Sequence, residues 1–290
     1  MICTLCPRLC AAERTETAGG GFCGAPSLPV VAKAMLHPWE EPCLAGRRGA
    51  GCVFFSGCSL RCSFCQNRAV SRTAFGKTLT PAELREVFRS LVSQGAECLD
   101  LVTPTHFTDA ILEALGDEPW SVPVVWNSSA YERAETLKRL AGRVDIYLPD
   151  LKYATREAGE KYAAAPDFFD FAREAIAEMY RQTGPFRMEN GRLLSGVLIR
   201  HLVLPGDLDN TRRCIDYVAR TFQSGEVLFS LMSQYVPPPD AVGPLARRVT
   251  AAEYRAAVRY MRDCGVTDGF VQDLSSATAL FTPDFDLQGL

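Results

Sequence analysis

Short apolar runs that alternate with helix-like segments are the feature that most limits how this 290-residue chain can fold. The runs lie at 51–56, 98–103, 122–127, 144–149, 197–203 and 226–232, with a seventh candidate at 269–272. Continuous apolar runs of this length are typical of strands buried on both faces, as in parallel sheets. We therefore predict an α/β fold in which helices join parallel strands by right-handed crossovers.

Helix signals fall between these runs. Residues 80–83 and 250–253 each read as a capping box, with Thr at the N-cap and Glu three residues later. Asn210 is expected to cap another helix, and a longer connection is expected to be helical around 168–183. Six such units predict a partial (β/α)6 TIM-like barrel, with a doubly wound open sheet as the alternative. In both folds the active site lies at the C-terminal ends of the strands.

Charge and hydropathy exclude several kinds of partner. The formal net charge is −3, and Lys and Arg are scattered, so no basic stripe indicates a nucleic-acid partner. The N-terminus lacks the pattern of a signal peptide, and no apolar stretch reaches the roughly 20 residues of a membrane span. We expect a soluble cytoplasmic protein without a nucleic-acid or membrane partner.

Most of the 12 cysteines lie in the first quarter of the chain. A secreted disulfide scaffold would be smaller and would carry an export signal. In a reducing cytosol, cysteines clustered at short spacing indicate metal ligands. We divide the chain into a Cys-rich N-terminal segment, 1–48, with a possible metal site, and the partial barrel, 49–290.

Three of these cysteines, Cys58, Cys62 and Cys65, follow the first apolar run on one compact loop. A structural zinc site uses four protein ligands, whereas a four-iron cluster with three cysteines leaves one iron open. S-adenosylmethionine (SAM) can fill that position, and an electron from the reduced cluster can then break a carbon–sulfur bond of its sulfonium. The alternative is zinc, with a fourth ligand such as Cys52.

The loop at 57–67, Gly-Cys-Ser-Leu-Arg-Cys-Ser-Phe-Cys-Gln-Asn, resembles the signature loop of the radical SAM superfamily. Within that superfamily it is most similar to proteins related to the pyruvate formate-lyase activating enzyme. Flanking stretches at 3–10, 37–43, 102–106, 147–153, 200–206 and 233–237 extend the resemblance over nearly the whole chain. The resemblance implies a [4Fe–4S] cluster and SAM cleavage to a 5′-deoxyadenosyl radical, which abstracts hydrogen from a substrate such as a glycyl radical enzyme. The alternative substrate is a small molecule or peptide, and the expected electron donor is flavodoxin- or ferredoxin-like.

The resemblance also implies SAM contacts along the chain, from Phe64, Asn67, Thr103, Asn127, Asp150, Lys152 and Arg200. A carboxylate at 150 can bind the ribose hydroxyls or the methionine amine, and the ammonium of Lys152 can bind the SAM carboxylate. The alternative is that Asp150 and Arg200 pair with each other across the barrel.

One stretch departs from the activating enzymes, which carry Gly-Gly-Glu after the second strand to receive the SAM amino group. Here residues 101–106 read Leu-Val-Thr-Pro-Thr-His, so Thr103 or its carbonyl is expected to take that role. His106 is expected to contact SAM or to start a helix.

Cys3, Cys6, Cys10 and Cys23 supply four more thiols. Four ligands suit a zinc site or an auxiliary iron–sulfur cluster. The metal would relay electrons, grip the substrate or hold a loop-rich segment together; we favour the structural role and leave the metal open. Glu40 and Glu41, which follow this segment, are expected to be surface charges rather than residues at the barrel mouth.

A rival interpretation is a non-catalytic iron–sulfur or zinc protein that transfers electrons or senses. It predicts four protein ligands on each metal and no SAM binding. We favour an enzyme, because electron carriers seldom need a βα scaffold of this size.

Overall fold

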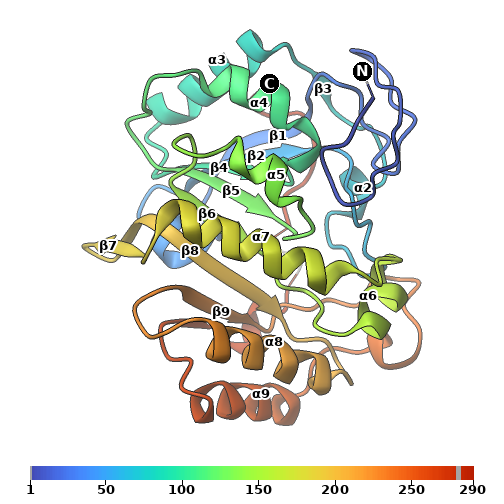
Figure 1. Cartoon of the computed structure of the whole chain (residues 1–290), viewed down its shortest axis with the longest axis vertical. Helices are drawn as coiled ribbons and strands as arrows, with labels where there is room; N and C mark the ends of the chain where they lie inside the picture. Colours follow the sequence, from blue (N-terminus) through green and yellow to red (C-terminus); the bar gives the residue numbers. More distant parts are fainter. Residues whose placement is uncertain (1, 279–281) are drawn as a thin grey trace.

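The computed structural model describes residues 2–278 and 282–290. The parallel part of its sheet runs in the spatial order β10-β9-β8-β6-β5-β4-β2 (Figure 1). These strands are β2 (Ala50–Phe55), β4 (Leu99–Val102), β5 (Val124–Ser128), β6 (Ile146–Pro149), β8 (Arg192–Leu202), β9 (Leu228–Met232) and β10 (Gly269–Val271). Each overlaps a run expected from the sequence, so the α/β prediction is confirmed.

Antiparallel strands extend the sheet at its edges. β1 (Val30–His37) lies between β2 and β3 (Lys77–Thr78), and β7 (Arg187–Glu189) forms a hairpin with β8. The sheet is open, with β10 and β3 at its two ends, which fits a partial TIM-like barrel. β1 lies within 1–48, where the sequence analysis expected no element. The division of the chain at residue 48 stays a prediction.

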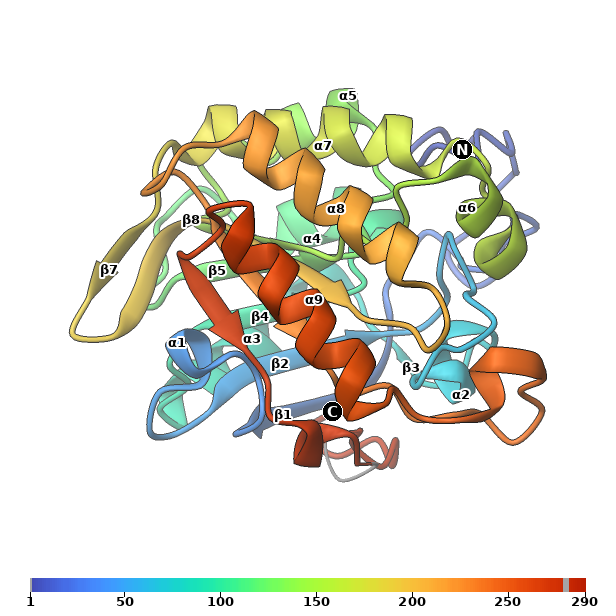
Figure 2. The same cartoon turned by 90° about the horizontal axis from the view of Figure 1, so that it is seen from below.

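Helices cover the outer face of the sheet, and Figure 2 shows α7, α8 and α9 lying across that face. The longer ones are α3 (Pro81–Ser93), α4 (Thr108–Leu115), α5 (Ala134–Lys138), α6 (Arg156–Ala163), α7 (Phe168–Thr183), α8 (Leu208–Thr221) and α9 (Ala251–Asp263). Short turns of helix are α1 (Pro42–Ala45), α2 (Arg68–Ser71), η1 (Thr105–Phe107), η2 (Gly243–Ala246) and η3 (Leu274–Ser276). None of the described helices is long and apolar enough to cross a bilayer.

Both capping boxes are confirmed. The Thr80 hydroxyl accepts the N–H of Glu83, and the Thr250 hydroxyl accepts the N–H of Glu253. The cap expected at Asn210 is wrong, because α8 begins earlier and this residue lies in its first turn. Its side-chain amide instead accepts from the N–H of Ala154 at 2.8 Å and donates to the carbonyl of Lys152 at 3.0 Å. Asn210 therefore fixes the chain just after β6.

The core explains the continuous apolar runs. Every residue of β2, β5, β6 and β9 is buried, since one face packs under the outer helices and the other faces the interior of the partial barrel. The largest fully buried side chains include Trp126, Tyr147 and Phe229, from β5, β6 and β9. The apolar packing thus leaves the strand ends as the place where polar side chains meet.

Candidate active site

A cavity opens at the C-terminal ends of the parallel strands, where the sequence analysis placed the active site. Its wall is formed by the last residues of the strands, among them Val102, Asn127, Arg200 and Met232. The loop that carries Cys58, Cys62 and Cys65 closes the opposite side. The seven residues that the resemblance implies as SAM contacts along the chain line this cavity: Phe64, Asn67, Thr103, Asn127, Asp150, Lys152 and Arg200.

The cysteine loop leaves β2 at a glycine that no other residue could replace easily. Gly57 has φ of +86°, and a Cβ there would lie 2.9 Å from the carbonyl oxygen of Cys23. Its N–H donates to Val70 in α2 at 2.9 Å, and the N–H of Ser63 donates to Tyr162 in α6 at 2.8 Å. The loop is therefore held by α2 at its start and by α6 in its middle.

Each thiol of the loop is near a hydrogen-bond donor. The Tyr153 hydroxyl lies 3.2 Å from Cys62 Sγ, the Ser71 hydroxyl 3.5 Å from Cys65 Sγ, and the N–H of Leu60 3.3 Å from Cys58 Sγ. Burial raises the pKa of the Cys62 thiol to about 12, and the nearby Lys152 ammonium opposes that shift. Without metal, Cys62 is therefore a thiol, and metal binding must displace its proton.

The spacing of these sulfurs argues against a closed zinc site. Tetrahedral zinc holds its thiolates about 3.8 Å apart, from a bond length of about 2.3 Å. In the described part of the chain, three Cys, His, Asp or Glu ligand atoms lie within 4.8 Å of one another only at Glu40, Cys52 and Asp100. At least two of the three loop thiols therefore lie more than 4.8 Å apart, wider than zinc requires, and Cys52 does not complete a compact site with them. Three thiols at this spacing beside a cavity fit a four-iron cluster with one open iron.

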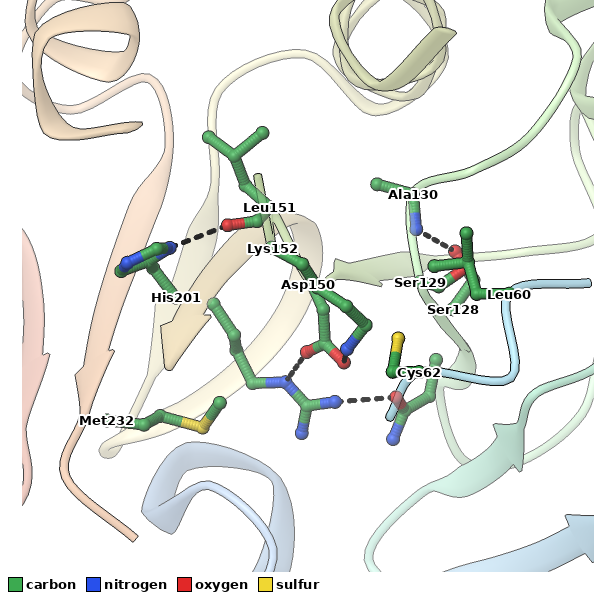
Figure 3. Close-up of polar contacts among 12 residues, drawn as sticks. Leu60, Cys62, Ser128, Ser129, Ala130, Asp150, Leu151, Lys152, His201 and Met232 are labelled. Atoms are coloured by element: carbon green, nitrogen blue, oxygen red, sulfur yellow. Dashed lines mark hydrogen bonds and ion pairs between the residues drawn. The ribbon is translucent and has the colours of Figure 1, made fainter. Parts of the chain in front are cut away.

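A network of charged and amide groups crosses the cavity below this loop. Asp150 accepts from Lys152 Nζ at 2.6 Å and from Arg200 Nε at 2.7 Å. Arg200 also donates to Asn127 Oδ1 at 2.7 Å and to Glu40 Oε1 at 2.9 Å. Figure 3 shows Cys62 and Met232 on opposite sides of the Asp150 carboxylate. The pairing of Asp150 with Arg200 weighed in the sequence analysis is thus present, and both side chains also line the cavity.

The charges of the network stabilise one another. Burial alone would raise the pKa of Asp150, but Arg200 and Lys152 outweigh it and hold this pKa below its usual value. Burial would likewise lower the pKa of Lys152, and the Asp150 carboxylate raises it instead. All three groups are therefore charged at neutral pH, and their geometry is fixed before any ligand binds.

The expectation that Glu40 and Glu41 are surface charges is wrong. The Glu40 side chain is 11% exposed and holds Arg200, while Glu41 is 6% exposed at the start of α1. Burial raises the pKa of Glu41 to about 7. Two adjacent glutamates suggested a solvated surface, but β1 and α1 turn them toward the interior of the partial barrel.

Sequence reasoning missed Asp100, which is fully buried in β4. Its Oδ2 lies 3.3 Å from the Cys52 thiol and 3.2 Å from Asn127 Nδ2, and its Oδ1 has no hydrogen-bond partner among the described residues. Burial, followed by the Glu40 carboxylate, raises its pKa well above the usual range. The available signal was a single acidic residue inside an otherwise apolar strand.

Thr103 is the residue that the sequence analysis expected to take the role of the Gly-Gly-Glu motif. It follows β4 with φ of +61°, a left-handed conformation that is uncommon for a β-branched residue. Its N–H donates to the carbonyl of Asn127 at 2.8 Å. The strained turn places Thr103 at the cavity wall, beside the end of β5.

Aromatic packing fixes the position of Phe64 next to the third cysteine. Its ring meets Tyr153, Tyr162 and Tyr235 edge-on, with centroids 6.4, 5.8 and 6.1 Å away. Asn67 precedes α2, and its carbonyl accepts the N–H of Ser71 at 2.9 Å. Both side chains are therefore presented to the cavity from rigid surroundings.

His106 lies in η1 and does not line this cavity. Its Nε2 is 2.7 Å from the carbonyl oxygen of Ser56, and burial lowers its pKa to about 4. A neutral, buried imidazole bound to the end of β2 supports the helix-start role expected from the sequence.

The chain is similar in sequence to two known proteins. The chain is 30% identical over 271 residues to Uncharacterized protein MJ0674 of Methanocaldococcus jannaschii, covering 88% of this chain and 73% of the relative. It is 30% identical over 116 residues to 7-carboxy-7-deazaguanine synthase of Methanothermobacter thermautotrophicus, covering 39% of this chain and 45% of that protein.

Among solved structures, the fold is similar to that of HydG, a maturase of the [FeFe]-hydrogenase. The TM-score is 0.51 at 17% identity, with 73% of this chain covered, and the chain spans 49% of the length of HydG. This likeness concerns the fold alone. The profile of the radical SAM superfamily matches residues 52–218, which is more than half of the chain. The chain therefore belongs to the radical SAM superfamily.

Proposed function

We propose that this protein holds a [4Fe–4S] cluster on Cys58, Cys62 and Cys65 and reductively cleaves SAM. Membership of the radical SAM superfamily implies both the cluster and SAM. The observation that carries the ligand assignment is the loop itself, with three thiols at more than zinc spacing beside a polar cavity. When bound, the cluster supplies the electron that yields a 5′-deoxyadenosyl radical, which abstracts hydrogen from a substrate.

The residues around the loop bind and shield the cluster. Tyr153 is fully buried, and its hydroxyl donates to the Cys62 sulfur at 3.2 Å. Phe64 and the tyrosines that surround it form an apolar wall behind the same sulfur. Hydrogen bonds to cluster sulfurs and exclusion of solvent are among the means by which a protein sets a cluster's potential.

The polar network is proposed to hold SAM. The methionine part of SAM carries an amine and a carboxylate, and the cavity offers carboxylates and cations close together. Asp150 would receive the amine or the ribose hydroxyls, and Lys152 and Arg200 the carboxylate. Phe64, Asn67, Thr103 and Asn127 complete the proposed contacts.

Arg200 and Arg192 provide a matched pair for testing this assignment, because both lie in β8 and both pair with a glutamate. Arg192 ends far from the cavity, 2.7 Å from Glu97. Arg200→Lys should weaken SAM binding about tenfold or more, since the planar guanidinium, which binds several partners at once, is lost. Arg192→Lys should leave SAM affinity unchanged, and equal effects of the two changes would contradict the assignment.

The function itself is tested by SAM cleavage. Anaerobically reconstituted, reduced protein should release 5′-deoxyadenosine and methionine, and Cys58→Ala should abolish this release. Cys264→Ser is the control, because this cysteine lies at the end of α9, away from the cavity. Intact cleavage by the Cys58 variant would sink the proposal.

A glycyl radical enzyme is the proposed substrate, as in the activating enzymes whose loop and flanking motifs this chain resembles. A protein substrate radical gives an EPR doublet on the partner that requires both this protein and SAM. A small molecule or peptide is the second candidate. It is favoured by the departure at 101–106 from the Gly-Gly-Glu that the resemblance leads one to expect, and by the similarity over 116 residues to a synthase of a small molecule. Absence of the doublet, together with SAM cleavage that a small molecule stimulates, would decide for this candidate.

Further proposals concern the surroundings of the enzyme. A flavodoxin- or ferredoxin-like donor supplies the electron, and the free thiols along the chain support a cytoplasmic location. The N-terminal cysteines are proposed to bind a metal, zinc or iron–sulfur, that holds their segment together.

A further inference from the structure

The four N-terminal cysteines converge although the segment has no regular structure. Within residues 2–29 the backbone forms only isolated β-bridges, at Ile2–Glu13 and Arg14–Gly19. The Arg14 guanidinium lies 3.6 Å from Cys3 Sγ and donates to the carbonyl of Ala25, two residues after Cys23.

The second half of the segment folds back toward Cys10. A Cβ at Gly21 would lie 2.9 Å from Cys10 Sγ, so the chain approaches that thiol two residues before Cys23. The N–H of Cys3 donates to the carbonyl of Ala12 at 3.0 Å, which brings the two ends of the stretch around Cys6 and Cys10 together. The four cysteines therefore lie in one folded segment.

Backbone strain accompanies this convergence. Leu9 and Ala11, on either side of Cys10, have φ of +42° and +48°. Such conformations cost about 1–3 kcal/mol each for residues other than glycine and persist only where other interactions enforce them. The few apolar contacts of the segment, made by Leu5, Cys6, Cys23 and Ala25, are a small core for this purpose. A bound metal supplies the missing constraint.

The spacing of the sulfurs favours a centre of more than one metal ion over a single zinc. Four thiolates around zinc lie about 3.8 Å apart. All four cysteines lie in the described part of the chain. Among any three of their sulfurs, at least one pair is more than 4.8 Å apart. The Cys58–Cys65 loop shows the same wider spacing, and there the family implies a cluster. A polynuclear centre, in which different irons hold different thiolates, suits this arrangement.

The segment also packs directly against the loop of Cys58, Cys62 and Cys65. A Cβ at Gly57, the residue before Cys58, would lie only 2.9 Å from the Cys23 carbonyl oxygen. Arg8 Nε donates to the carbonyl of Ser59 at 2.8 Å, and Arg8 and Arg61 lie 4.0 and 5.3 Å from the centre of the Phe22 ring. In Figure 1 the N-terminal trace accordingly lies beside α2. These arginines and Arg14 place positive charge around a site with four thiolates.

From this geometry we infer that Cys3, Cys6, Cys10 and Cys23 bind a second iron–sulfur cluster, which fixes the N-terminal segment against the SAM-cluster loop. The inference deepens the proposed metal-binding role of this segment, and it does not depend on SAM cleavage.

The decisive experiment separates the two sites in the full-length chain. Cys58, Cys62 and Cys65 are replaced together by alanine, and the protein is reconstituted anaerobically with iron, sulfide and zinc present. The variant should retain two to four irons with equal sulfide and the visible absorbance of a cluster, where the wild type holds roughly four irons more. A variant that holds zinc, or no metal, would overturn the inference.

The complementary variant replaces Cys6 and Cys23 by serine, with Cys264→Ser as the matched control. It should lose the two to four irons of the second site, keep the roughly four irons of the Cys58 site, and digest faster by protease within residues 2–29. The control should lose neither iron nor protection. Unchanged iron in the Cys6/Cys23 variant would also overturn the inference.

If this variant fails to fold, the iron content of the triple-alanine protein still decides. Lack of SAM cleavage, by contrast, would refute the proposed function and leave these metal counts unaffected.

Discussion

Glu41→Gln should remove a pH-dependent loss of folding stability that the ionisation of this buried carboxyl causes. Glu41 is 6% exposed and has no ion pair among the described residues, although Arg200 lies near enough to oppose the effect of burial. Burial, followed by the charges of Glu40 and Asp150, raises its pKa from 4.5 to about 7. The folded protein therefore keeps this proton over a range in which the unfolded chain has released it.

The sign and size of the effect follow from linkage. Between pH 4.5 and about 7 the folded state binds more protons than the unfolded state, so the free energy of unfolding falls as pH rises. At about 1.4 kcal/mol per pKa unit, the full interval corresponds to roughly 3 kcal/mol. Glutamine resembles the protonated acid and does not ionise. The variant should therefore match the wild type near pH 4.5 and become more stable by about 3 kcal/mol above pH 7.

Urea unfolding of iron-loaded protein, under anaerobic conditions from pH 4.5 to 8, measures this difference. All other titrating groups are shared, so the difference between the two proteins isolates Glu41. Glu86→Gln is the control, since that side chain is 67% exposed on α3 and its change should give a nearly flat difference. A difference between Glu41→Gln and the wild type that stays constant with pH would refute the reasoning.

Two further predictions concern the cavity and its support. Tyr153→Phe removes the hydroxyl that lies 3.2 Å from Cys62 Sγ, so the midpoint potential of the SAM cluster should fall. An EPR-monitored redox titration measures this potential, and an unchanged value would show that the hydrogen bond does not act on the cluster. Glu132→Ala removes a fully buried carboxylate that accepts from Trp126 Nε1 at 2.9 Å and from the hydroxyls of Ser128 and Thr105 at 2.6 and 2.8 Å. Leaving these donors unpaired should cost about 3 kcal/mol or more in urea unfolding, and a loss below about 1 kcal/mol would contradict their role.

Local patterns predicted the elements of this fold. Strands buried on both faces read as continuous apolar runs, so β2, β4, β5, β6, β8, β9 and β10 could be located without a structure. The capping boxes at Thr80 and Thr250 are equally local, because cap and partner are three residues apart. The cysteine loop belongs to the same class of signal, since its three ligands lie within eight consecutive residues, 58–65.

β1 shows where local patterns fail. Lys33 interrupts its apolar run, and this lysine is nevertheless 5% exposed, because Asp286 near the other end of the chain pairs with it at 2.9 Å. The same limit explains Glu40 and Glu41, which read as solvated surface until the chain turns them inward. Burial of a charged residue depends on a partner that the local sequence does not contain.

The sequence by itself determined the strands, the helix starts and the three thiols of the cluster loop, since each depends on residues close together in the chain. Only the tertiary structure decided the polar network. Arg200 reaches Asp150, Asn127 and Glu40 across 50, 73 and 160 residues of sequence. Which side chains meet at the ends of parallel strands depends on the order of strands in the sheet, and no local periodicity encodes that order. The contact of the N-terminal cysteines with the cluster loop is decided in the same way, by packing between distant segments.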